Sequence, residues 1–167
     1  KCLEYSVKNN KLTGNVDLLI AANLTETKNS GIINNTDYTI TIRPDQDADR
    51  KISFTQAADN AGPSGAFIIG CDMGLTFTAT PTKNVVIDGY VQGGSTRRLT
   101  IETPSSFGTF VGPIIIYGNV TNTIVKNCNI VNTKTSTSSN VYGITLRTEK
   151  NTDNKPYGVV IENNNIT

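Results

Sequence analysis

The sequence contains no histidine and no tryptophan. Histidine is the usual general base near neutral pH and a frequent zinc ligand, so its absence removes the commonest routes to acid–base catalysis and zinc binding. The three cysteines, Cys2, Cys71 and Cys128, are odd in number and far apart, without metal-binding spacing, and no disulfide is predicted. We expect Cys128 to be a small core residue and not a ligand.

Charged residues are also scarce. Fifteen basic and fourteen acidic residues give a net charge of +1, which argues against the basic face of a nucleic-acid-binding protein. No apolar run is long enough to cross a membrane. The opening Lys1-Cys2-Leu3-Glu4-Tyr5 does not have the pattern of a signal peptide, so we expect a processed or excised piece. The length of 167 residues suits a single domain over residues 1–167.

Thr, Asn, Ser and Gly are abundant instead, and this composition favours exposed β-structure joined by tight turns. A two-strand unit occurs three times in the second half of the chain. The copies are 75–80 with 85–91, 114–119 with 123–130, and 144–148 with 159–166. Self-similarity at such a period indicates stacked repeats, and short strands with turns make the stack a β-solenoid.

A degenerate fourth copy is predicted earlier in the chain, with strands at 39–42 and 52–54. When this copy is aligned with the other three, Ile40 is equivalent to Ile115, and Ser53 is equivalent to Ile87. The remaining strand of each turn is assigned to 16–21, 66–70 and 99–102. The resulting prediction is an all-β, right-handed parallel β-helix with three strands per turn and roughly four turns. Residues 2–10 are expected to form a short helical cap over the N-terminal end.

The apolar positions of these strands predict the core. The residues expected to be buried are Ile40, Ile42, Phe54, Val85, Ile87, Ile116, Val125, Ile130, Leu146 and Ile161.

The residue that follows the second strand of each copy is Gly89, Asn127 or Asn163. Glycine and asparagine adopt a positive φ most cheaply, so a sharp bend is predicted there. Stacked copies would place Asn127 above Asn163, where the two amides could form a hydrogen-bonded ladder. The alternative is that asparagine is simply frequent in this chain.

Several short sequence segments resemble those of a known family. They are 38–44 (YTITIRP), 84–89 (NVVIDG), 98–102 (RLTIE) and 122–128 (NTIVKNC), with Leu12-Thr13-Gly14 before the first strand. The chain resembles pectin-lyase-like right-handed β-helices, and these phrases resemble β-helix segments of very large secreted surface proteins of Bacteroidota-type bacteria. The resemblance covers nearly all residues. It implies an extracellular or cell-surface location and names no activity.

Because this fold is common among polysaccharide lyases and hydrolases, an enzyme fragment acting on acidic polysaccharide is the alternative function. Candidate bases and acids for such an enzyme are Arg97, Arg98, Lys126, Arg147, Asp88, Glu102, Glu149 and Glu162. Asp88, Lys126 and Glu162 share one phase of the repeat, so a surface column of ion pairs is favoured over catalysis. No residue is assigned a catalytic role.

Two binding sites are considered. Asp45, Asp47 and Asp49 have the alternation of a calcium loop, but they lack the glycine and the distal glutamate of an EF-hand, so a solvated turn is favoured. No other cofactor is predicted. Aromatic faces stack on sugars, and the aromatic residues near loops or strand ends that could bind glycans are Tyr90, Tyr117, Tyr142 and Tyr157, together with Phe107 and Phe110.

The last strand, at 159–161, is as apolar as the inner ones, and residues 163–167 (NNNIT) contain no proline, no charge and no covering segment. An uncovered end would expose unpaired backbone groups over an open core. We therefore expect either further turns or a second molecule stacked on this end. The sequence thus predicts a structural or adhesive module, self-associating end to end into a filament or binding glycans.

Overall fold

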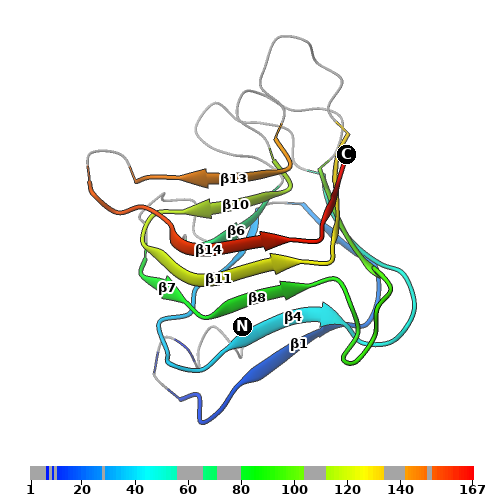
Figure 1. Ribbon diagram of the computed structural model, residues 1–167, viewed down its shortest axis with the longest axis horizontal. Helices are drawn as coiled ribbons and strands as arrows, with labels where there is room; N and C mark the ends of the chain where they lie inside the picture. Colours follow the sequence, from blue (N-terminus) through cyan, green and yellow to red (C-terminus); the bar gives the residue numbers. More distant parts are fainter. Residues whose placement is uncertain are drawn as a thin grey trace.

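The described part of the chain consists of short β-strands joined by turns, as a computed structural model shows (Figure 1). The description covers residues 7, 9, 11–27, 29–55, 66–70, 80–103, 112–133, 142–149 and 152–167. The strands form three sheets in which every pair of neighbouring strands is parallel. The prediction of an all-β protein of stacked parallel strands is confirmed.

The first sheet forms the front of the molecule in Figure 1. Its strands, in order across the sheet, are β1 (Val16–Ile20), β4 (Ile40–Pro44), β8 (Val85–Asp88), β11 (Val120–Lys126) and β14 (Tyr157–Glu162). The two-residue strand β7 (Thr82–Lys83) pairs with the beginning of β11.

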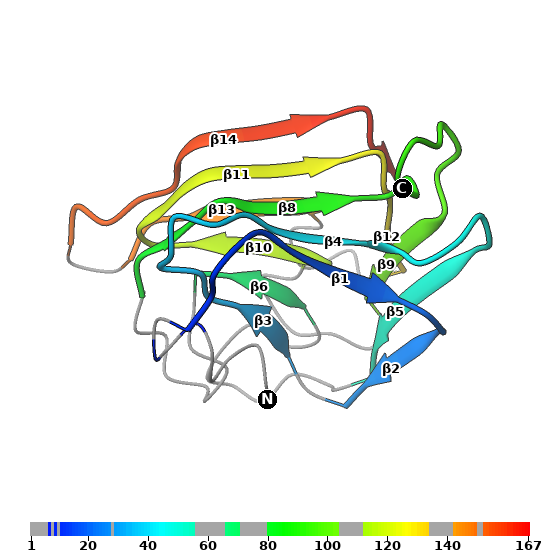
Figure 2. The same cartoon turned by 90° about the horizontal axis from the view of Figure 1, so that it is seen from below.

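The other two sheets are built in the same way. The second sheet contains β2 (Leu24–Glu26), β5 (Arg50–Phe54), β9 (Leu99–Thr103), β12 (Asn129–Asn132) and β15 (Asn165–Ile166). The third contains β3 (Ser30–Ile32), β6 (Phe67–Ile69), β10 (Ile114–Tyr117) and β13 (Ile144–Arg147). The chain visits the three sheets in the same order on each pass, completes four passes and ends in a fifth with β14 and β15 (Figure 2).

The predicted phase of the first part of the repeat is wrong. Ile42, not Ser53, is the register partner of Ile87, because β4 belongs to the first sheet and β5 to the second. The strands assigned to 16–21, 66–70 and 99–102 lie in three different sheets, as β1, β6 and β9. Each pass holds three short strands of similar pattern, so the spacing fixes the length of a pass but not which strand opens it. The predicted strand 75–80 lies outside the described residues except Thr80.

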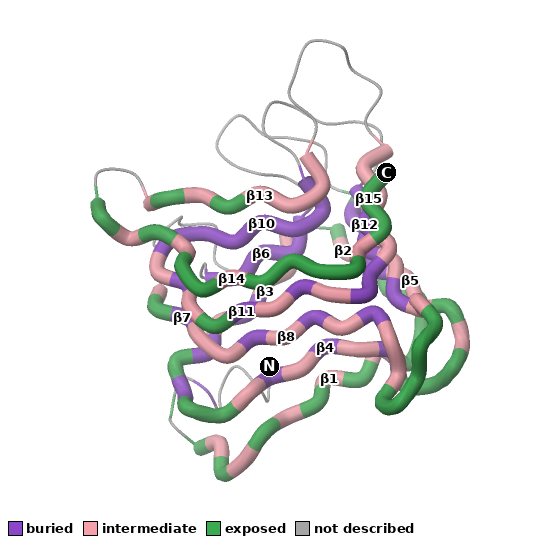
Figure 3. The backbone as a smooth tube through the Cα atoms, in the orientation of Figure 1, coloured by how far each residue is buried: buried purple, intermediate pink, exposed green. Residues whose placement is uncertain are grey.

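The main core lies between the sheets and is filled by β-branched side chains that alternate with outward-facing ones. The row Ile42, Ile87 and Val125 crosses the first sheet, and Ile52, Ile101 and Ile130 cross the second. Eight of the ten predicted core residues are buried. The exceptions are Leu146 and Ile161, which are 46% and 43% exposed because their strands are the last of their sheets (Figure 3).

The expected helical cap over residues 2–10 is not seen. No helix occurs among the described elements, and of this segment only Val7 and Asn9 belong to the described residues. Val7 is buried in the main core, and Leu12 packs against it. The first pass is therefore partly covered by residues that precede it in the chain.

Candidate functional site

Asparagines line the corner between the first and second sheets. The backbone of Asn127 and of Asn163 has a positive φ, of 60° and 50° respectively. The Asn163 amide donates to Oδ1 of Asn127 over 2.7 Å, and the Asn127 amide donates to Oδ1 of Asp88, also over 2.7 Å. A column of three side chains thus links three successive passes, with a carboxylate as its first member.

Gly89 lies in the same column for a different reason. It is not among the residues with positive φ, but a Cβ atom there would lie 1.9 Å from the carbonyl oxygen of Asn127. Only glycine allows the two backbones to approach so closely. Proximity, and not a left-handed bend, therefore explains the glycine at this position.

The 90–98 loop, between β8 and β9, reaches the same column from the side. Arg97 donates to Oδ1 of Asn163 over 2.7 Å and to its carbonyl oxygen over 3.0 Å. The Asn163 amide also donates to the Tyr90 hydroxyl over 2.9 Å. Both N–H groups and the oxygen of this amide are therefore hydrogen-bonded within the protein. This favours a structural role for Asn163 over a role in binding a ligand.

A second row of left-handed residues lies at the beginning of the first-sheet strands. Asn84, Asn122 and Gly158 have φ values of 56°, 50° and 62°. Sequence reasoning missed this row, although a signal exists. Each of these residues stands three positions before Ile87, Val125 or Ile161, which occupy one row of the repeat.

The candidate acids and bases of an enzyme are spread over the three sheets, and some of them are in ion pairs. Asp88, Lys126 and Glu162 are register partners, and Lys126 Nζ lies 3.5 Å from Asp88. Glu102 accepts hydrogen bonds from Lys51 and Ser53 on the second sheet. Arg147 pairs in register with Tyr117 on the third sheet, and Glu149 binds Asn154 in the turn that follows. Arg97, Asp88 and Lys126 thus gather at one corner of the stack, and the other candidates lie elsewhere.

The three aspartates of the 45–49 turn face arginines. Asp45 pairs with Arg50 at 2.9 Å, and Arg98 contacts Asp47 at 2.7 Å and Asp49 at 3.1 Å. The hydrogen bond from Arg98, and then its positive charge, lower the pKa of Asp47. Within the described ranges, no group of three acidic, histidine or cysteine side chains is arranged to hold a metal ion. The geometry favours an arginine-paired turn.

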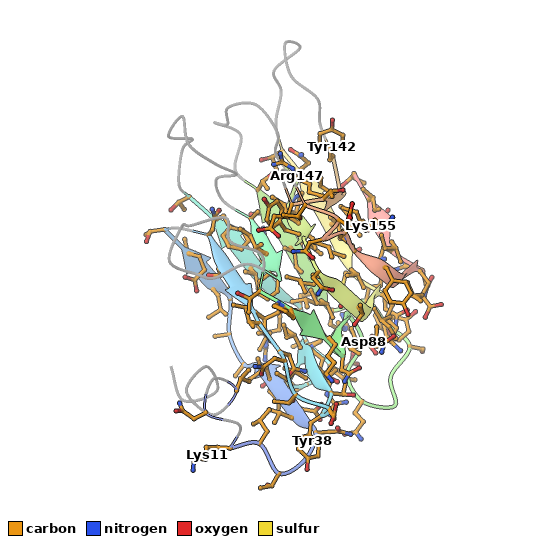
Figure 4. All side chains as sticks on the ribbon, turned by 90° about the vertical axis from the view of Figure 1, so that its left-hand side faces the viewer. Lys11, Tyr38, Asp88, Tyr142, Arg147 and Lys155 are labelled. Carbon is orange, nitrogen blue, oxygen red and sulfur yellow. The ribbon has the colours of Figure 1, made fainter. Side chains whose placement is uncertain are left out.

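The four tyrosines considered for glycan binding do not converge on one surface. Tyr90 lies at the corner after the first sheet and Tyr117 is buried at the end of β10, with 7% exposure. Tyr142 precedes β13 and lies well away from Asp88 in Figure 4. Tyr157 begins β14 and is 68% exposed. Phe107 and Phe110 lie outside the described residues.

Cys128 is a buried free thiol at the same corner as the asparagine column. Burial is the main cause of the strong rise in its pKa, and the charge of Asp88 adds to it. The thiolate that would act as nucleophile or ligand is therefore disfavoured. Cys2 and Cys71 lie outside the described residues.

A small cavity lies where the chain enters the first sheet. It has a volume of about 250 Å³, and its lining residues are Asn35, Pro81, Thr82, Lys83, Asn119 and Thr121. The wall formed by the 34–38 turn is fixed by Asn34, which is fully buried. The Asn34 amide donates to the carbonyl oxygens of Tyr38 and Lys83 over 2.8 and 2.9 Å.

The C-terminal end of the stack exposes residues that are equivalent to core residues. Ile161, Leu146 and Ile166 are 43%, 46% and 50% exposed, whereas their register partners Val125, Ile116 and Ile130 are fully buried. Among the described strands, β13, β14 and β15 each pair with a neighbour on one side only. The other edge of each strand has no strand partner within the described ranges, and this set of edges is called the C-terminal face below.

Comparisons with family models, curated proteins and solved structures gave no match. No helix within the described ranges is long and apolar enough to span a membrane.

Proposed function

We propose that the chain is a structural module, a right-handed parallel β-helix whose C-terminal face binds the N-terminal end of a second copy. Three parallel sheets visited in a constant order support the β-helix. Its resemblance to segments of secreted surface proteins supports a place at the cell surface, in a scaffold or adhesin. The association at the C-terminal face depends on one observation, the exposure of Ile161, Leu146 and Ile166 in core positions.

The open edges supply both parts of a stacking interaction. Apolar side chains at core positions would lose water contact under another pass, and each open edge would gain parallel backbone hydrogen bonds. The N-terminal end offers the matching strands β1, β2 and β3, one for each sheet, beside Val7 and Leu12, which cover part of the core there. Because the two ends differ, the contact is head-to-tail, and its repetition builds a filament and not a closed dimer.

The outer surface favours this structural role over the alternative, a polysaccharide lyase or hydrolase. Four of the acids and bases that such chemistry would use are engaged in ion pairs, namely Asp88, Lys126, Glu102 and Arg98, and Glu102 lies on a different sheet from Asp88. An inverting or retaining hydrolase needs two carboxyl groups facing one substrate, roughly 5–10 Å apart. The described acidic residues support such a facing pair of carboxyl groups less well than the exposed isoleucines and leucine of the C-terminal face support stacking.

Sedimentation velocity of the 167-residue chain over a range of concentrations tests the stacking. We expect the average sedimentation coefficient to rise with concentration without a plateau at the dimer. The double substitution Ile161→Lys and Ile166→Lys places charges on the C-terminal face and should abolish the rise. Val160→Lys is the matched control, because Val160 is as exposed as Ile161 but points outward from the same strand. A chain that stays monomeric throughout would refute the proposal.

A further inference from the structure

The cavity at the entry to the first sheet has walls that the fold holds in place. The Lys83 N–H donates to the Asn34 carbonyl over 2.7 Å, and the Thr82 N–H donates to the Asn119 carbonyl over 3.0 Å. Oδ1 of Asn34 accepts from the backbone N–H and the hydroxyl of Thr36. The turn that holds Asn35, the strand β7 and the turn that holds Asn119 are therefore bonded to one another before any ligand arrives.

The groups around the cavity are polar and of both hydrogen-bonding types. Asn35 and Asn119 supply amides, and Thr121 supplies a hydroxyl. The Thr82 hydroxyl is buried without a hydrogen-bond partner among the described residues, but it lies on the inward side of β7, in register with the core residue Val120. Amides and hydroxyls both donate and accept, which suits a ligand whose own groups are hydroxyls.

The charge at the rim is balanced. Lys83 Nζ lies 2.6 Å from a carboxylate oxygen of Asp37, and this hydrogen bond is the main cause of the lowered pKa of Asp37. An anion would have to compete with Asp37 for Lys83. A neutral hydroxyl can instead donate to the carboxylate or accept from the ammonium group without breaking the pair.

An aromatic ring stands in the same row of the sheet. Lys83, Thr121 and Tyr157 are successive register partners across β7, β11 and β14. Neighbouring strands lie about 4.8 Å apart, so this row advances by roughly the width of one pyranose ring at each strand. Tyr157 is the most exposed of the large hydrophobic residues among those described, at 68%. A further pass stacked on β14 would leave this outward-facing row accessible.

From this arrangement we propose a binding site for one neutral sugar unit of a polysaccharide. Asn35, Lys83, Asn119 and Thr121 hold its hydroxyl groups, and Tyr157 stacks on the ring of that unit or of its neighbour. The volume of 250 Å³ is below the usual range for drug-sized ligands and suits a single pyranose. The site is independent of the stacking proposed above.

Affinity gel electrophoresis tests the site, with dextran, laminarin, mannan or galactan cast in the gel and polygalacturonate as the anionic comparison. We expect at least one neutral polymer to retard the chain. Tyr157→Ala should then weaken binding about tenfold, the value of one well-stacked aromatic contact. Thr121→Val and Asn119→Ala should also weaken it, whereas Val160→Ala, on the same strand, should leave retardation unchanged.

Three results would overturn the proposal. They are no retardation by any of the four neutral polymers, retardation by polygalacturonate alone, and retardation that Tyr157→Ala and Thr121→Val both leave intact. Circular dichroism of each variant separates loss of binding from loss of fold. The sedimentation of Tyr157→Ala should match that of the unmodified chain, so failure of the sugar site and failure of the stacking are read from different measurements.

Discussion

Ile87 and Ile161 occupy the same position of the repeat, in one row of the first sheet with Val125 between them, yet Ile87 is fully buried and Ile161 is 43% exposed. Both directly follow two valines, so their local sequence does not distinguish them. The difference arises from the strands on either side. In this fold a residue is buried by the passes above and below it, and an inner position differs from a terminal one by the presence of a second neighbour.

The largest expected effect is on stability. Ile87→Ala should cost about 2–5 kcal/mol, since it removes transfer free energy and leaves a cavity. Ile161→Ala should cost about 1 kcal/mol, because much of its side chain is already in water. Urea unfolding at low protein concentration measures both. Equal losses at the two positions would mean that the last pass is covered in solution.

A turn substitution separates backbone conformation from burial. Asn127→Val should destabilise the fold by roughly 1–2 kcal/mol more than Asn127→Gly, since a β-branched residue is strained at a φ of 60°. The same difference should recur at Asn163, which has a φ of 50° but is exposed. If the Val and Gly variants were equally stable at either position, the preference for asparagine there would not be due to the left-handed backbone.

A smaller effect concerns the link between the 90–98 loop and the last pass. Arg97→Ala removes two hydrogen bonds to Asn163 and should cost about 1–2 kcal/mol locally. Amide exchange should accelerate in β14 and β15 and stay unchanged in β4 and β8. Arg98→Ala is the control, because the neighbouring arginine contacts Asp47 and Asp49 instead. Faster exchange in β14 with this control would contradict the assignment.

The smallest expected effect is on the pH dependence of stability, and it concerns the exposed ion pair between Asp47 and Arg98. The pKa of Asp47 is lower in the folded chain than its usual 3.8, so the ionised form stabilises the fold. That contribution is present above pH 3.8 and is lost as the pH falls through the lowered pKa. Asp47→Asn should flatten the decline of Tm in this acidic window by a small amount, since the pair is exposed and screened by salt. An unchanged decline would show that the pair contributes nothing.

The sequence predicted the fold where the information was local. Alternation such as Ile40-Thr41-Ile42 gave the strands, and the phase of Asn127 and Asn163 gave the bend. The phase of the whole repeat was misassigned, because three similar strands in each pass make every starting point look alike. The partners of the 45–49 aspartates could not be inferred either, because Arg98 lies about fifty residues away along the chain. The cavity beside Lys83 combines turns from three passes, which no single stretch of sequence reveals.

The contact of Arg97 with Asn163 joins residues that are 66 positions apart and skips one whole pass of the stack. A repeat protein whose units touch only their neighbours unfolds gradually from its ends. Here the last unit cannot detach without also breaking a bond to the unit two places before it. The loop therefore couples three units into one cooperative block, which should sharpen the melting transition. It should also slow folding, because this bond forms only after the long intervening segment has been ordered.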